Sequence, residues 1–300
     1  MVSPATALVT DVASLPIDFD MPLLLEACRE AGVRTEVCQW DDPSVEWSGF
    51  AAVLLRSPWS YVDRLPEFLS WCDRVAAETR LFNPVSVAHW SLDKTYLADL
   101  AARGVAVVPT TFLGPDDDPR EVLAQFLAEH PGAGEIVVKP TVGAYSKDVQ
   151  RFARLSADEA AHYAARLRDK GSGVMLQPYL AAVDRDGETD MIFFDGVYSH
   201  AIRKSPLLLP DGTVNVPTQD ARSPRAADAA ERALGTAALD AVAAHLGLDA
   251  PLLYGRVDLV RDDDGAPVVL EVELCEPSLS LPFTDLGATR FAHALARRLD

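Results

Sequence analysis

The chain has 300 residues, of which 49% are hydrophobic, and its formal net charge is −18. This length is ample for a sizeable core in one large or two to three smaller domains. The negative charge argues against nucleic acid or an anionic membrane as the main partner, because both would repel the protein. A few local cations could still build a cleft for an anionic ligand.

The sequence has no run of eighteen apolar residues, and its N-terminus has no basic segment followed by an apolar run. We therefore predict neither a membrane span nor a signal peptide. The four cysteines are scattered, with no Cys-x-x-Cys spacing. This usage favours a reducing, cytoplasmic location and argues against a structural zinc site. The oligomeric state stays open, a homo-oligomer included.

Strands and helices alternate over about the first 90 residues. Strands are predicted near 5–10, over RTEVCQW (34–40) and over 51–57. Helices with apolar residues at helical spacing follow from about Met21 and over 65–79. This alternation predicts an open α/β sheet with parallel strands.

The rest of the chain mixes longer helices with hairpins. Its predicted elements are a helix from Ser91 to Gly104, a helix over 119–130, a strand at 135–140, a helix from Ser156 to about Lys170 with a capping-box start, a strand at 174–180, a hairpin about Asp195-Gly196, a Pro-rich connection over 205–225, a helix over 225–247, a final hairpin and a helix over 284–299.

The final hairpin, GRVDLVRDDDGAPVVLEVEL (255–274), gathers acidic residues on one face. Its Asp264-Gly265 dipeptide is the preferred one for a two-residue type I′ turn. Counting outward from that turn places Asp258 opposite Glu271 and Arg256 opposite Glu273. The other face is predicted to be uniformly apolar: Val257, Leu259, Val268, Leu270, Val272 and Leu274.

Three carboxylates on one face suit a hard divalent cation, which takes oxygen ligands and bridges phosphates. This interpretation makes the hairpin the floor of a cleft above a packed core. The alternative is a hydrated edge hairpin with a charged face.

Two lysines and a loop indicate a site for an anion. Lys139 lies in the apolar strand IVVKP, where burial without an anionic partner would be costly. The next loop supplies Gly143, Ser146 and backbone donors that could surround phosphates, although a surface turn is the alternative. Lys94 opens a predicted helix and could face an anion there, or could be an ordinary surface lysine. No Walker A motif is present.

The order of these motifs carries a resemblance. The chain resembles the ATP-grasp superfamily in the order of six motifs, which are Asp93-Lys94, VVKP, LQPYL, GETD, RVDLV and LEVEL. The layout is similar to that of bacterial glutathione synthetase from Lys94 almost to the C-terminus. The resemblance implies an α/β ATP-grasp fold with an N-terminal open α/β (pre-ATP-grasp) domain. The expected parts are that domain at 1–90, a central subdomain at 91–180 with a phosphate lid loop at 141–148, and a C-terminal subdomain at 181–300 that carries the metal site.

The resemblance also implies the site residues. The expected ATP contacts are Lys94, Lys139, Gly143, Ser146, Gln177, Pro178, Tyr179, Leu180 and Glu188. Two Mg²⁺ ions are expected on Asp258, Glu271 and Glu273, and the expected catalytic arginines are Arg203 and Arg256. The lid loop departs from the glycine-rich pattern of the superfamily, and Glu273 stands where glutathione synthetase has asparagine.

The chemistry implied is an ATP-dependent ligation. A substrate carboxylate attacks the γ-phosphoryl group, and an amine or similar nucleophile captures the acyl phosphate. RSPWSY and GVYSHAIRKSP further resemble a small, single-chain actinobacterial group that includes the cyclo-ligase of D-cycloserine biosynthesis. The resemblance to that cyclo-ligase implies activation of the carboxylate of O-ureido-D-serine, followed by attack of an intramolecular nitrogen that closes the isoxazolidinone ring.

The partners expected are therefore ATP and a small amino-acid-like substrate. Candidate substrate contacts lie at a strand end and after the last strand: Arg56, Ser57, Trp59, Ser278 and Ser280. Trp59 could equally be an aromatic residue packed in the core. His200 could be a catalytic base or a packing residue. Cys275 is expected to be a small, buried hydrophobic residue.

Two other functions remain open. One is a peptide-type ligase that joins a small amino acid to a separate amine. The other is an ATP-binding module that modifies or scaffolds a protein, although a complete set of metal-binding acids weighs against pure binding.

Overall fold

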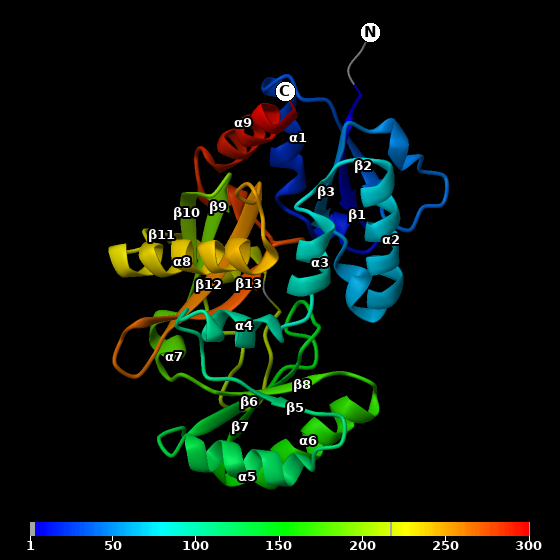
Figure 1. Ribbon diagram of the computed structural model, residues 1–300. Coiled ribbons are helices and arrows are strands. Elements are labelled where there is room, and N and C mark those ends of the chain that lie inside the picture. The colour runs from blue at the N-terminus through cyan, green and yellow to red at the C-terminus, as the bar shows by residue number, and fades with distance from the viewer. Residues whose placement is uncertain (1–3, 217, 300) are drawn as a thin grey trace.

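The computed structural model describes residues 4–216 and 218–299, and three β-sheets organise them (Figure 1). The first sheet has the order β2-β1-β3-β4, and all its neighbours are parallel. Its strands are β1 (Thr6–Thr10), β2 (Thr35–Gln39), β3 (Ala52–Ser57) and β4 (Leu81–Phe82). The predicted open parallel sheet is confirmed. Helices α1 (Met21–Glu30), α2 (Leu65–Glu78) and α3 (Val85–Ser91) bury apolar side chains beside it.

The second sheet is antiparallel, with the order β11-β10-β9-β12-β13. Its strands are β9 (Glu188–Phe194), β10 (Val197–Lys204), β11 (Arg222–Arg225), β12 (Tyr254–Arg261) and β13 (Pro267–Glu273). Helix α8 (Ala229–Leu246) covers its apolar face, where Ala238 and Val242 join the core beneath Met191 and Phe193. The last helix, α9 (Gly287–Leu299), lies beside α1 and ties the chain's end to the first sheet (Figure 1).

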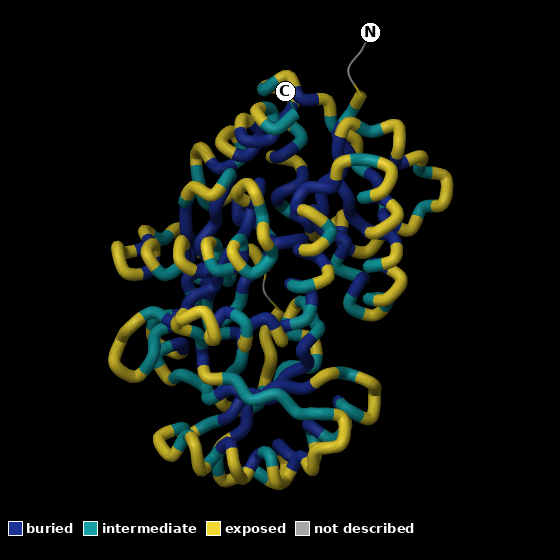
Figure 2. Tube along the Cα trace, in the orientation of Figure 1, coloured by how far each residue is buried: buried dark blue, intermediate teal, exposed yellow. Residues whose placement is uncertain are grey.

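The third sheet has the order β5-β8-β6-β7 and is also antiparallel. Its strands are β5 (Thr111–Leu113), β6 (Glu135–Pro140), β7 (Gln150–Ala153) and β8 (Val174–Pro178). Helices α5 (Pro119–Glu129) and α6 (Ala157–Asp169) bury their apolar faces against it in a separate small core. The chain is buried in the centres of these layers and exposed along the outer bends (Figure 2).

The remaining helices are short. Two are α-helices, α4 (Tyr96–Ala102) and α7 (Ala182–Asp186), and six are 3-10 turns at Leu15–Ile17, Trp47–Gly49, Trp59–Asp63, Arg154–Ser156, Gln219–Ala221 and Leu281–Phe283. Among the described residues, no helix combines the length and apolar character that a membrane span requires.

Three local predictions are wrong. The helix predicted from Ser91 is broken, because α3 ends at Ser91 and α4 begins at Tyr96, which leaves Lys94 in the turn between them. The Asp93 carboxylate accepts the Thr95 N–H at 3.0 Å, a local bond that stabilises this turn. Ser156 makes no capping hydrogen bond at α6. The connection over 205–225 contains the edge strand β11.

The final hairpin reaches its predicted register by an unpredicted route. The Asp262 N–H bonds to the Ala266 carbonyl, so the loop holds three residues with Gly265 at φ +80°, and the two-residue turn is wrong. A bulge between Asp258 and Leu259 then restores the count.

The two deviations cancel beyond the bulge. Asp258 faces Glu271 and Arg256 faces Glu273, as predicted. The apolar face is only partly as predicted, because the bulge turns Val268 and Leu270 to the other side, where they pack with Val260. Val269 takes the core position instead.

Candidate functional site

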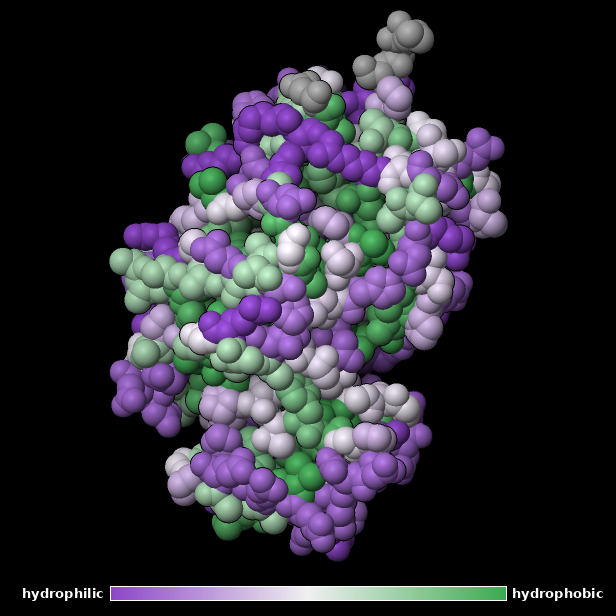
Figure 3. All heavy atoms as spheres, in the orientation of Figure 1, coloured by the Kyte–Doolittle hydropathy of each residue, from purple (hydrophilic) through white to green (hydrophobic). Residues whose placement is uncertain are grey.

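A cavity of about 570 Å³ lies where the three sheets meet. Its floor is the polar face of the second sheet, and its walls come from β6 and β8, from residues 143–149 and from loops that follow β1 and β3. The outline of the molecule is indented between the third sheet's layer and the rest of the protein (Figure 3). Loops after parallel strands and one sheet face therefore converge on a single space.

The charge of the cavity differs from that of the protein. Six cationic side chains and five carboxylates line it, although the whole chain carries −18. The cations are Lys94, Lys139, Lys147, Lys204, Arg222 and Arg256, and the carboxylates are Glu188, Asp258, Glu271, Glu273 and Glu276. Such a local excess of cations fits an anionic ligand in an otherwise acidic protein.

Strand register builds the polar floor. On β10, Lys204 lies opposite both Glu188 of β9 and Arg222 of β11. On β9, Asp190 lies opposite Asp258 of β12, which in turn faces Glu271 of β13. Paired residues point to the same face, so these charges share one surface.

Most of these charged side chains take part in ion pairs with one another. Lys94 Nζ lies 3.0 Å from Glu271 and donates to the Gly143 carbonyl at 3.1 Å. Lys204 Nζ lies 2.7 Å from Glu188 and 3.5 Å from Asp258. Because acidic neighbours outweigh the opposing effect of burial, the pKa of each lysine is raised. Both lysines therefore stay charged at neutral pH.

Arg256 connects two of the predicted metal ligands. Its guanidinium lies 2.5 Å from Glu273 and 2.7 Å from Asp258. Burial, followed by the charges of Asp258 and Glu271, nevertheless raises the pKa of Glu273 to about 8, against the opposing effect of Arg256. Burial and the two neighbouring carboxylates therefore disfavour the ionised form of Glu273. The carboxylates fit a divalent cation, whose charge would stabilise their ionised form.

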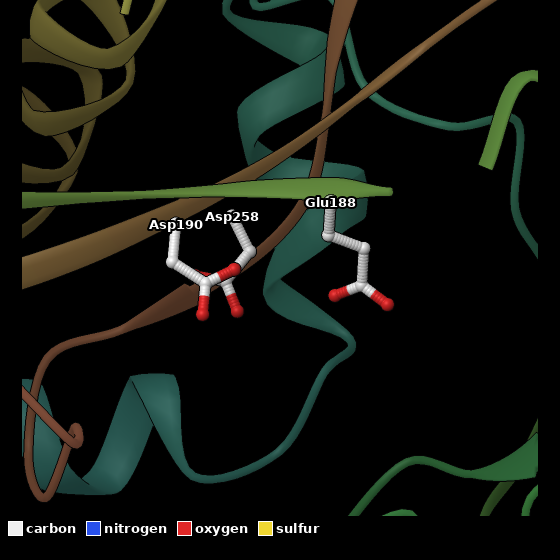
Figure 4. Close-up of side chains that lie close together, drawn as sticks. All are labelled: Glu188, Asp190 and Asp258. Carbon is white, nitrogen blue, oxygen red and sulfur yellow. The ribbon is translucent and has the colours of Figure 1, made fainter. Parts of the chain in front are cut away.

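The closest grouping of acids differs from the predicted set. Carboxylate oxygens of Glu188, Asp190 and Asp258 lie within 4.8 Å of one another, and the side chains of Asp190 and Asp258 lie side by side (Figure 4). Asp258 thus belongs both to this grouping and to the predicted one with Glu271 and Glu273. Both Asp190 oxygens are buried without a hydrogen bond among the described residues, and burial raises its pKa.

Lys139 is a buried cation without an anion. It is 8% exposed on β6, and within the described chain it has no hydrogen bond or ion pair of its own. Burial lowers its pKa to about 8, and the nearby Glu271 only partly offsets this effect. An anionic group such as a phosphate would supply the missing partner.

The exit of β8 and the apolar end of the floor form a further wall. Gln177, Pro178, Tyr179 and Leu180 all line the cavity, as do Val260 and Leu270 across it. The Tyr179 N–H is bonded to the Glu135 carbonyl at 3.0 Å, which holds this segment against β6. The apolar surface and the backbone edge together suit a flat heterocycle.

Fifteen of the predicted site residues line the cavity: Trp59, Lys94, Lys139, Gly143, Ser146, Gln177, Pro178, Tyr179, Leu180, Glu188, Arg256, Asp258, Glu271, Glu273 and Ser278. Four do not: Arg56, Ser57, Arg203 and Ser280. The structure brings the first group together without testing the role of any member.

Each of these four side chains packs or forms hydrogen bonds within the protein, away from the cavity. Arg56 is buried between the rings of Tyr254 and Phe291 and donates to the Pro277 carbonyl at 3.0 Å. The Ser57 hydroxyl donates to Thr10 at 2.8 Å.

Arg203 and Ser280 are likewise turned away from the cavity. Arg203 donates to the carbonyls of Asp186 and Arg185, because it lies on the opposite face of β10 from Lys204. Ser280 is fully buried at φ +53°, and its N–H bonds to Asp20.

His200 and Cys275 are packing residues. His200 is bonded to the Leu279 carbonyl at 2.8 Å, and burial lowers its pKa to about 4. Cys275 is 2% exposed, and burial raises the pKa of its thiol. The prediction of a buried Cys275 is confirmed.

The sequence analysis missed Lys204, Arg222, Asp190 and Glu276. Asp190 follows Glu188 by two residues and so shares its face, a signal that strand periodicity could have given. Lys204 stands beside the residue chosen, and only the β10 register separates the two. Arg222 lies in the unpredicted strand β11, so no sequence signal places it.

Comparisons with known proteins agree with this architecture. Residues 6–83 match the family model for the N-terminal domain of D-cycloserine synthetase DcsG. The chain is 60% identical over 293 residues to the cycloserine biosynthesis protein DcsG of Streptomyces lavendulae, with 98% of each chain covered. It superposes on the crystal structure of D-cycloserine synthetase DcsG with a TM-score of 0.96 at 59% identity, over 99% of this chain and 100% of that one.

A more distant likeness concerns the fold alone. The ATP-grasp ligase PsnB, in complex with a phosphomimetic precursor variant, Mg and ADP, gives a TM-score of 0.66 at 18% identity, with 100% of both chains covered.

Proposed function

This chain belongs to the DcsG family of ATP-grasp ligases, and from that premise we propose that it converts O-ureido-D-serine to D-cycloserine. The enzyme is an ATP-dependent ligase with the α/β fold of the ATP-grasp proteins. The observation that carries the proposal is the 60% identity with the cycloserine biosynthesis protein over nearly the whole chain. The locally cationic cavity supports it.

ATP would lie between the third sheet and the polar floor. The wall of Gln177 to Leu180 with Val260 and Leu270 suits the adenine, and Glu188 suits the ribose hydroxyls. The phosphates would meet Lys94, Lys139 and the backbone of the 141–148 loop. Lys139 in particular lacks an anionic partner in the described structure.

Two Mg²⁺ ions are proposed on Asp258, Glu271 and Glu273. When bound, magnesium neutralises phosphate charge and polarises the transferred phosphoryl group. Phosphates near Lys94 would also offer this lysine an anion in place of Glu271, which would free that carboxylate for a cation.

The chemistry has three steps. An oxygen of the substrate carboxylate attacks the γ-phosphorus and ADP leaves, which forms an acyl phosphate. The nitrogen bonded to the side-chain oxygen then attacks the acyl carbon and loses its proton, and phosphate leaves as the ring closes. Water cleaves the bond between this nitrogen and its carbamoyl group, which leaves as carbamate and breaks down to CO2 and ammonia, and the nitrogen takes up a proton. Arg256 and Lys204 face this region and would stabilise negative charge as it develops.

The division of roles we propose follows the sheets. Residues 1–90 would supply the loops around the end of the cavity that binds the amino acid. Residues 91–180 would supply the nucleotide wall and the lid loop, and residues 181–300 would supply the polar floor.

The test is phosphate release from Mg-ATP with O-ureido-D-serine, its L isomer or D-alanine. Release with the D-ureido compound alone, lost in Glu271→Gln but kept in the exposed control Glu129→Gln, would support the proposal. Release only when an amino acid is supplied with a separate amine would instead favour the peptide-type ligase. Absence of release with every compound would overturn the proposal.

A further inference from the structure

Most charged side chains in the cavity are already paired. Eight of the eleven take part in ion pairs, including Lys147, which lies 2.6 Å from Asp63. Within the described part of the chain, the other three, Lys139, Arg222 and Glu276, make no ion pair. Lys139 lies on β6 beside the nucleotide wall. Arg222 and Glu276 lie against the loops that follow β1 and β3.

Arg222 is held in place but not neutralised. One of its guanidinium nitrogens donates to the Ser278 hydroxyl at 2.8 Å, and its Cζ lies 4.8 Å from the ring centre of Phe19. Its Nε is buried and has no acceptor among the described residues. Burial lowers its pKa from the ordinary value. The side chain therefore has unused donors at the cavity wall.

Glu276 is the matching unpaired carboxylate. It is 7% exposed, lines the cavity and is hydrogen-bonded by the Tyr61 hydroxyl. Trp59 Nε1 donates to its carbonyl at 2.9 Å, which fixes the backbone of this residue. No cationic side chain pairs with it in the described structure. A buried carboxylate whose donors, the Tyr61 hydroxyl and its own backbone N–H, are both neutral is best completed by a cation.

The surroundings limit what can lie between these two groups. Trp59 and Tyr145 of the lid loop meet edge to face, with ring centres 5.0 Å apart. Asp20 accepts hydrogen bonds from the N–H groups of Leu279 and Leu281 at 2.6 and 2.7 Å, which fixes the loop after Glu276. Aromatic walls and a rigid loop suit a small molecule with both charges.

We propose that Arg222 and Glu276 form the amino-acid subsite, in which Arg222 binds the substrate carboxylate and Glu276 binds its α-ammonium group. Arg222 is opposite Lys204 in the sheet register, so an oxygen that it holds lies beside the polar floor where the phosphates are placed. The proposal rests on the proposed function for the identity of the reacting carboxylate. The substrate class it names is a free, zwitterionic amino acid with a small polar side chain.

The experiment compares Arg222→Gln and Glu276→Gln with wild type in steady-state turnover and in ATP binding. The probe is whichever of O-ureido-D-serine, its L isomer and D-alanine the wild type turns over best. We expect the KM for the amino acid to rise about 10- to 100-fold in each variant, as for a lost hydrogen bond to a charged group. The Kd for Mg-ATP without amino acid should change less than about 2-fold, which also shows that the variants are folded.

A probe analogue separates binding from a structural role. Wild type should bind the corresponding acid without its α-amino group about 10-fold or more weakly than the amino acid, and Glu276→Gln should lose this preference. The matched control for Arg222 is Arg225→Gln on the same strand, whose side chain pairs with Glu231 outside the cavity.

The outcomes separate the two proposals. If wild type turns over O-ureido-D-serine and both variants keep their KM, the subsite is wrong and the proposed function survives. If another amino acid is turned over and its KM rises in both variants, the subsite stands and the named substrate is wrong. Weakened ATP binding with an unchanged amino-acid KM would assign Arg222 to phosphate. No turnover of any probe would overturn both.

Discussion

Burial of Lys139 without an anion lowers the pKa of its ammonium group to about 8. In the unfolded chain this group titrates near the ordinary value, about 10.4. The unfolded state therefore binds more protons between about pH 8 and pH 10.4, and the contribution of Lys139 to stability becomes more favourable as pH rises through that window. Below pH 8 the buried charge is destabilising, and a bound phosphate would remove this penalty.

Lys139→Met should therefore separate stability from ligand binding. Without nucleotide at pH 7, the variant should be more stable than wild type by at most about 3 kcal/mol, because it removes the buried charge. Its affinity for Mg-ATP should fall at least about 10-fold. Thermal unfolding and titration calorimetry measure the two effects.

The wild-type affinity for ATP should also decline above about pH 8, with proton uptake on binding, because ATP favours the charged lysine. Lys139→Met should lack this uptake. Lys170→Met, at an exposed lysine near Asp148, is the matched control and should retain it. Equal proton uptake in all three proteins would contradict the assignment of Lys139 to phosphate.

At the scale of elements, the alternation of side chains between the two faces of a strand could be predicted from the sequence. The β-bulges, which interrupt this alternation, could not. Strands β1, β2 and β3 and helices α1 and α2 follow from hydrophobic periodicity, and the resemblance supplied the fold beyond the first sheet. In the hairpin about Asp195-Gly196, simple counting would place Arg203 opposite Glu188. The observed register shift between Tyr198 and His200 places Lys204 there instead.

A bulge depends on packing across the sheet, which a single strand sequence does not encode. The same limit explains why Leu270 lines the cavity when its predicted place was the core. The predicted acidic pairs of the final hairpin are correct only because a bulge compensates for the longer turn.

The contact of α8 with the second sheet gives an element-scale prediction. A Cβ at Gly235 would lie 2.2 Å from the Met191 side chain and 3.0 Å from Phe193. Gly235→Ala should destabilise the protein by about 1–2 kcal/mol, because overpacking outweighs the gain in helix propensity of about 1 kcal/mol. Chemical unfolding measures this change.

Thr236→Ala is the control on the exposed side of the same helix. It should raise stability by a few tenths of a kcal/mol through helix propensity alone. If Gly235→Ala were as stabilising as this control, the close packing of α8 on β9 would be wrong.

At the scale of the whole molecule, the sheets are joined by single buried polar residues far apart in sequence. Asp20 binds the loop after β13, and Tyr254 donates toward the carbonyls of Leu55 and Cys275. No periodicity or motif could predict such links, because each depends on where two separately folded surfaces meet. The amino-acid subsite lies at this junction, which is why Arg222 and Glu276 escaped the sequence analysis.

Asn83 provides the sharpest test of this junction. Its side chain donates to the carbonyls of Tyr254 and Leu274 at 2.8 and 2.7 Å and accepts from the Leu253 N–H at 2.9 Å. Asn83→Ala leaves these buried groups unpaired, so we expect a loss of about 2–4 kcal/mol. The exposed Asn215→Ala should change stability by less than about 0.5 kcal/mol.

Function should respond as well, because Asn83 holds the first sheet, with its Trp59 loop, against the strand that leads to Glu276. In Asn83→Ala the amino-acid KM should rise more than the Kd for Mg-ATP, because the proposed nucleotide wall belongs to the third sheet and the polar floor. Urea unfolding, steady-state kinetics and ATP titration on the same preparation measure all three quantities. Equal loss of both affinities would mean that the junction supports the entire cavity and has no particular effect on its amino-acid end.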